Sequence, residues 1–72
     1  MVLDFFQLRQ ELETRILART GRRVRNLDVE LSPERVILRG QAGSYHVKQL
    51  AQHGVQEVLP DVRLENAIIV RQ

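Results

Sequence analysis

The stretch "RVILRGQAGSYHVKQLAQHGV", residues 35–55, changes its hydrophobic period in the middle. Its first part alternates apolar and polar side chains, which is typical of a strand with one solvated face. Its second part places apolar residues three and four positions apart, which is typical of an amphipathic helix. Gly40 and Gly43 separate the two parts, and Ser44 stands immediately before the helix. We therefore predict a strand over 35–40 and a helix over 45–59.

The predicted second helix shows the most regular period in the chain, and Pro60 ends it. Ala51 and Gly54 are small and lie on its apolar face, so we expect this helix to approach the sheet closely. Tyr45 begins the helix and is either a surface contact or a partly buried residue, of which we favour the second. The residues of the apolar face are Val47, Leu50, Ala51, Gly54, Val55 and Val58.

A first helix is predicted over 5–19, upstream of two strands. Asp4 caps it, with Gln7 three residues later in the position that closes a capping box. Gly21 ends it, because glycine readily adopts the left-handed conformation found at helix C-termini. The apolar residues Phe5, Leu8, Leu12 and Ile16 follow one another at steps of three and four.

The strands are predicted over 24–31, 35–40 and 62–70, with a proline turn between the first two. In the second strand Ile37 falls on the solvated face, where one exposed isoleucine needs no explanation. In the third strand Asn66 falls in phase with the apolar residues, and it marks either a bulge or an inward-facing amide with a backbone partner.

The resulting order is α-β-β-α-β, which predicts an α+β fold. Two amphipathic helices must cover one face of a three-stranded sheet, and this gives a small two-layer sandwich. A mixed sheet is favoured, with the third strand parallel beside the second. An antiparallel place beside the first strand is the alternative.

Length and composition limit the possible functions. With 72 residues the chain makes one small domain, 1–72, with no room for a deep substrate cavity. The absence of cysteine excludes disulfides and thiolate zinc sites. No signal peptide or membrane span is apparent. The expected location is cytoplasmic as the chain stands, or periplasmic or envelope-associated if a leader has been removed.

The arginines are concentrated near the predicted end of the first helix, although the net charge is only +2. Such a cluster is suited to phosphate on a lipid headgroup or on nucleic acid. A solvated helix end followed by a loop is the structural alternative. The candidate residues for an anionic surface are Arg19, Arg22, Arg23 and Arg25.

No residue set for catalysis is recognisable, so we expect no enzyme, no cofactor and no small-molecule substrate. His46 and His53 lie seven positions apart, about 10 Å along a helix, whereas chelation on a helix uses a spacing of three or four. No metal site is therefore expected. Gly40 and Gly43 have the spacing of a nucleic-acid clamp but no basic residue between them, so nucleic acid is not the expected partner.

The two glycines and the serine are instead interpreted as a structural joint. We expect Gly40 to face inward, where a side chain would strike the helix returning over the sheet. Gly43 is expected to supply backbone freedom for the turn, and Ser44 to cap the helix.

Val36, Leu38 and Gly40 form a V-x-L-x-G strand, Ser44, Lys48 and Ala51 follow at the helix entry and in its interior, and Asn66, Ile68 and Val70 lie in the last strand. With these residues the chain resembles a BON domain, the bacterial osmotic-stress and nodulation module, over about residues 24–70. Asp61 departs from the pattern, since the family commonly has glycine there. The resemblance implies the same α-β-β-α-β sandwich and a non-enzymatic module that binds phospholipid surfaces or envelope proteins. A related fold that builds rings in secretion assemblies suggests the alternative, a protein–protein or self-assembly module using its sheet edges.

Overall fold

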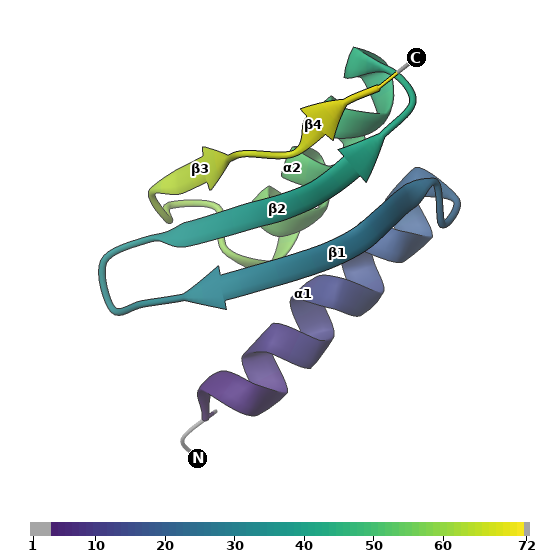
Figure 1. Ribbon diagram of the computed structural model, residues 1–72. Helices are drawn as coiled ribbons and strands as arrows, with labels where there is room; N and C mark the ends of the chain where they lie inside the picture. Colours follow the sequence, from purple (N-terminus) through teal and green to yellow (C-terminus); the bar gives the residue numbers. More distant parts are fainter. Residues whose placement is uncertain (1–3, 72) are drawn as a thin grey trace.

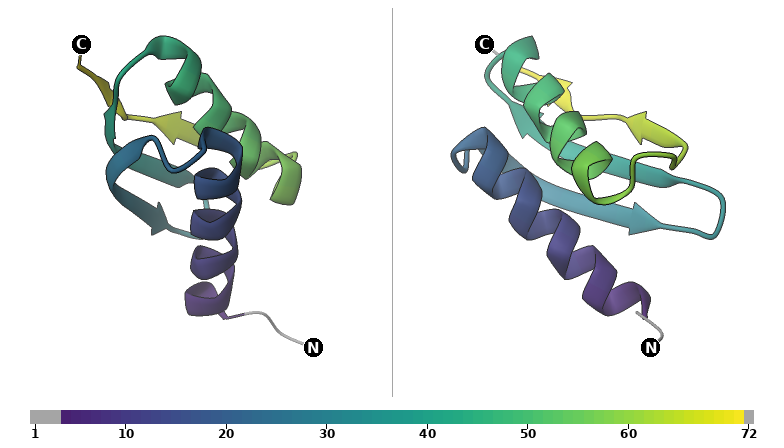
Figure 2. Two further views of the ribbon diagram at one scale, coloured as in Figure 1. Left: turned by 90° about the vertical axis from the view of Figure 1, so that its right-hand side faces the viewer. Right: turned by 180° about the vertical axis from the view of Figure 1, so that it is seen from behind.

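The computed structural model describes residues 4–71 and consists of one mixed sheet and two helices (Figure 1). Both helices lie on the same side of the sheet, as the further views show (Figure 2). The predicted α+β sandwich with α-β-β-α-β order is therefore confirmed. The elements are α1 (Phe5–Thr20), β1 (Val24–Leu31), β2 (Val36–Ala42), α2 (Tyr45–Val58), β3 (Leu64–Asn66) and β4 (Ile69–Val70).

Asp4 and Gly21 end α1 as the sequence predicts, but among the described residues Gln7 makes no return side-chain bond that would close the capping box. The Asp4 side chain accepts a hydrogen bond of 2.8 Å from the backbone N–H of Gln7. Gly21 ends the helix with a φ of 61°, in the left-handed region. Phe5, which was expected on the buried face, is 53% exposed. The reason is that α1 runs past the edge of the sheet at its N-terminal end (Figure 1).

The sheet is built around β2. β1 pairs with it antiparallel, while β3 and β4 pair with it parallel. The predicted mixed sheet is thus confirmed, and the alternative place for the third strand beside β1 is wrong. Because β4 runs parallel to β2, the last described residues lie next to the end of β2, where the turn to α2 begins.

The predicted third strand is divided into β3 and β4. Both segments have the same register offset relative to β2, so no residue is inserted between them and Asn66 does not mark a bulge. Its amide faces inward instead. Nδ2 donates to the backbone carbonyl of Lys48 at 2.9 Å, and Oδ1 accepts from the backbone N–H of Ile68 at 3.3 Å. Of the two interpretations left open, the inward-facing amide is correct.

β1 carries a bulge that the sequence analysis did not anticipate. The register shifts between Arg25 and Asp28, and Asn26 has a φ of 54°. Gly40, which lies opposite, has a φ of 151°, and a Cβ atom there would lie 2.9 Å from the carbonyl oxygen of Arg25. The expectation that Gly40 leaves space for α2 is therefore wrong. The space is taken by β1, because the bulge brings the β1 backbone toward it.

The two helices pack directly on each other as well as on the sheet. A Cβ atom at Gly54 would lie 3.2 Å from the Cα of Ile16 in α1. Gly54 therefore allows α2 to approach α1, whereas the sequence analysis expected a close approach to the sheet. The reason is that both helices share one face of a narrow sheet. The buried core consists of Leu12, Ile16, Val24, Val29, Val36, Leu38, Ala42, Val47, Ala51, Val55 and Ile68.

The open face of the sheet is covered by ion pairs. Ile37 is only 4% exposed, although it was expected to be exposed on this face. Its neighbours on the adjacent strands are Glu30 on β1 and Glu65 on β3. Glu30 forms an ion pair with Arg39 at 3.1 Å, and Glu65 forms one with Arg35 at 3.3 Å. Long charged side chains bury apolar surface under their stems, and this explains the burial of Ile37.

Candidate anion-binding site

Three of the four predicted arginines lie together. Arg22, Arg23 and Arg25 line one hollow of about 700 Å³, and Arg71 lines it with them. The hollow lies at the end of the molecule where the α1–β1 turn, the β2–α2 turn and the last residues meet, on the right in Figure 1. We call it the arginine pocket. Its other lining residues are Gln41, Ala42, Gly43, Ser44 and Val47.

Arg19 does not belong to the pocket. Its guanidinium binds both carboxylate oxygens of Glu57 on α2, with Nε and Oε1 separated by 2.9 Å. This hydrogen bond lowers the pKa of Glu57. Arg19 thus links the two helices and does not belong to the group of arginines that lines the pocket.

The turn after α1 carries the first two arginines into the pocket. Gly21 and Arg22 both have a φ of 61°, which reverses the chain within two residues. The Arg22 backbone N–H donates to the carbonyl of Leu17 at 2.9 Å. Nε of Arg23 donates to the carbonyl of Thr20 at 2.8 Å, which holds the start of that side chain.

The other two arginines flank the end of β2. Arg25 pairs with Gln41 from the β1 side, and the Arg71 backbone N–H donates to the carbonyl of Ala42 at 2.7 Å from the opposite side. Neighbouring strands lie about 4.8 Å apart, so the two backbones are separated by roughly 10 Å. Arginines therefore flank the end of β2 on both sides.

Arg71 was not among the predicted site residues, although the predicted topology implied its position. A last strand that runs parallel to β2 has its C-terminal end beside the C-terminal end of β2. The residue that follows it must then lie near the β2–α2 turn. The prediction of a parallel third strand therefore already implied a fourth arginine beside Gly43.

Within the described residues 4–71, no carboxylate neutralises the positive charge of the pocket. Among residues 4–71, no carboxylate oxygen lies within 4 Å of a guanidinium nitrogen of these four arginines, while Arg9, Arg19, Arg35 and Arg39 each have such a partner. The sequence stretches 14–27, 35–56 and 66–71, which include every residue that lines the pocket, contain no Asp or Glu. The four positive charges thus reinforce one another over this surface.

The start of α2 forms one wall of the pocket. The Ser44 side chain accepts a hydrogen bond of 3.2 Å from the backbone N–H of Val47, so Ser44 caps the helix. The N-terminal end of a helix adds a partial positive charge. The structure gives Gly43 no positive φ, and a Cβ atom there would only approach the Arg71 carbonyl at 4.0 Å. The predicted need for backbone freedom at Gly43 is therefore wrong.

Tyr45 follows the cap and is 70% exposed. Our preference for a partly buried tyrosine was wrong, because α2 turns this residue away from the sheet. It is the only tyrosine of a chain without tryptophan. In the chain it directly follows Ser44, which lines the arginine pocket.

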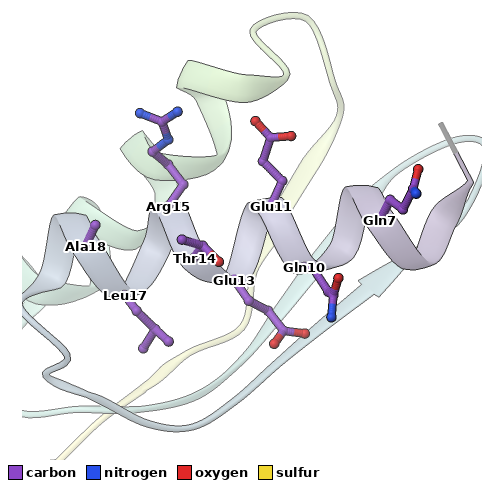
Figure 3. Close-up of a pocket in the computed structure, with 8 residues that line it drawn as sticks. All are labelled: Gln7, Gln10, Glu11, Glu13, Thr14, Arg15, Leu17 and Ala18. Atoms are coloured by element: carbon purple, nitrogen blue, oxygen red, sulfur yellow. The ribbon is translucent and has the colours of Figure 1, made fainter. Parts of the chain in front are cut away.

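A second hollow, of about 850 Å³, lies along α1 (Figure 3). All of its lining residues belong to this one helix, and their side chains point to several sides of it. A hollow with a single wall does not enclose a ligand, so we do not assign a site to it. The lining residues are Gln7, Gln10, Glu11, Glu13, Thr14, Arg15, Leu17 and Ala18.

The histidines and helices offer no further site. His46 and His53 are both exposed on α2. Within the described range 4–71, no three His, Asp or Glu residues lie close enough to share a metal ion. Neither helix in this range combines the length and the apolar character needed to cross a membrane.

Comparison of the chain with protein-family models, with curated proteins and with solved structures found no match. The functional argument therefore depends on the geometry of the arginine pocket and its surroundings.

Proposed function

We propose that this domain is a non-enzymatic, BON-like binding module that attaches to an anionic phospholipid surface. The observation that carries the proposal is the convergence of four arginines, without a carboxylate partner among the described residues, on one end of the molecule. The BON resemblance and the α-β-β-α-β order support it. We assign the surface contact to Arg22, Arg23, Arg25 and Arg71.

The expected attachment is weak and reversible. A basic residue near an anionic membrane contributes about 1 kcal/mol, and the attraction fades within a Debye length. Four arginines therefore hold the domain at low salt and release it as salt rises. Exposed Tyr45 adds an amphipathic side chain of the kind that favours the membrane interface.

The test is sedimentation with vesicles of phosphatidylglycerol and phosphatidylcholine. We expect the protein to sediment with them at about 20 mM salt, to be released near 150 mM salt, and to ignore vesicles of phosphatidylcholine alone. Replacing Arg22 and Arg23 by Gln should remove most of the binding. The matched control is Arg35→Gln with Arg63→Gln, which removes the same charge at the opposite end of β2 and β3.

Two results would overturn the proposal. One is the absence of sedimentation with anionic vesicles at low salt. The other is an equal loss of binding in the control variant, which would mean that net charge alone matters.

Assembly through the sheet edges is the second candidate function. β1 pairs with one strand only, so its outer edge lacks a strand partner among residues 4–71. The bulge at Asn26 interrupts this edge, and bulges are a common protection against edge pairing. We therefore rank assembly below surface binding. Concentration-dependent oligomers that persist at high salt would favour it.

A further inference from the structure

The arginine pocket is a hollow lined by four arginines rather than a flat charged surface. Arg25 and Arg71 stand on opposite sides of the end of β2, and the α1–β1 turn adds Arg22 and Arg23. Ala42 and Val47, each 3% exposed, are the buried residues of the lining. Arginines from three chain segments thus line one hollow together with the helix cap Ser44.

The four arginines of the pocket offer more N–H donors than the two free oxygens of a phosphodiester can accept. Each guanidinium presents a planar fork of N–H groups that suits two oxygens of one anion. A phosphodiester carries one negative charge and two free oxygens, whereas a monoester carries about −1.5 to −2 and three free oxygens. Four arginines without a carboxylate partner among residues 4–71 are therefore better neutralised by a monoester.

We propose that the arginine pocket binds a phosphate monoester group. This inference rests on the proposed function. It predicts that the domain binds lipids whose headgroup ends in a phosphomonoester more tightly than phosphodiester lipids of equal surface charge. The same chemistry recognises a free phosphate, so the experiment must separate the lipid from the soluble ligand.

The first arm of the test uses soluble anions. Inorganic phosphate and dimethyl phosphate are titrated at constant ionic strength, and the fluorescence of Tyr45 is followed, since it is the only tyrosine and no tryptophan is present. The amide NMR signals of Gly43 and Ser44 provide a second readout. We expect a saturable response to inorganic phosphate and one at least tenfold weaker to dimethyl phosphate.

Matched variants show whether the response belongs to the pocket. Arg71→Gln should weaken phosphate binding at least fivefold, because it removes the guanidinium on the β4 side. Arg63→Gln, which removes the same charge near the start of β2, should leave it unchanged. Equal weakening in both variants, or no saturable response in either readout, would overturn the assignment.

The second arm uses vesicles of phosphatidic acid and of phosphatidylglycerol with matched surface potential. We expect the protein to remain on phosphatidic acid at higher salt, and Arg71→Gln to abolish this difference. Equal binding to both lipids without a phosphate response would overturn the monoester pocket and leave surface binding intact. A phosphate response without vesicle binding would overturn the proposed function and make the ligand soluble. Failure of both arms would overturn both.

Discussion

At the scale of single residues, the backbone of β1 determines where glycine is required at the end of the sheet that carries the arginine pocket. Asn26 adopts a positive φ, and the bulge that it forms occupies the space where a side chain on Gly40 would lie. Gly40 and Gly43 are three positions apart, yet only Gly40 has a conformation and a surrounding that require glycine.

The stability of the Gly40→Ala variant tests this difference. We expect a loss of about 1–3 kcal/mol in the free energy of unfolding, because the new Cβ atom meets a backbone carbonyl and the φ of 151° is unfavourable for alanine. Gly43→Ala is the control and should change stability by less than about 0.5 kcal/mol. Urea unfolding measures both changes in the free energy of unfolding, provided that its slope against urea concentration is the same in the variants and the unmodified protein. Equal midpoints for the two variants would contradict the structure.

At the scale of elements, the α1–α2 contact has an electrostatic component. Arg19 and Glu57 connect the helices near the close approach at Gly54. Since the hydrogen bond from Arg19 lowers the pKa of Glu57 in the folded protein, the pair favours folding when the carboxylate is ionised. Its contribution is therefore present above pH 4.5, the ordinary pKa of Glu57, and is lost as the pH falls through the lowered folded value.

A double-mutant cycle with Arg19→Gln and Glu57→Gln tests this pH dependence. We expect a favourable coupling free energy at pH 7 that declines toward zero as the pH falls through the lowered pKa of Glu57 and its carboxylate becomes protonated. Thermal or urea unfolding of the four proteins at several pH values gives the coupling. A coupling free energy that stays the same from pH 7 down to acidic pH, where the carboxylate is protonated, would show that the contact between the helices does not depend on the ionised pair.

At the scale of the whole molecule, the two ends differ in chemical character. The longest dimension is 42 Å, with the arginine pocket at one end and the N-terminal end of α1 at the other (Figures 1 and 2). Phe5 and Phe6 are exposed at the latter end, by 53% and 65%. If the arginines face the anionic surface, these aromatic residues point away from it.

Replacing Phe5 and Phe6 by Ser tests this orientation. We expect the double variant to bind anionic vesicles at low salt within about twofold of the unmodified protein, because electrostatic attraction at the other end is unchanged. Vesicle sedimentation and the circular dichroism of the free variant are the measurements. Loss of binding with the fold retained would show that the aromatic end inserts into the membrane instead.

Local patterns in the sequence were sufficient for the elements and their order. Hydrophobic period and capping depend on residues a few positions apart, so the helices and strands were placed to within a few residues at each end. The β1 bulge was not predicted. It is visible in the structure, where Val24 and Val29 are both buried although they are an odd number of positions apart, which requires one extra residue between them.

The membership of the arginine pocket was decided only by the tertiary structure. Arg22, Arg23 and Arg25 are neighbours in the sequence, but Arg71 joins them because β4 pairs parallel with β2. Arg19 lies outside the pocket, because the packing of the two helices places Glu57 next to Arg19. Strand register and helix packing connect residues that are distant in the sequence, and no local pattern encodes such contacts. The sequence therefore determined the fold and three of the pocket arginines, while the packing of distant segments determined the completed pocket.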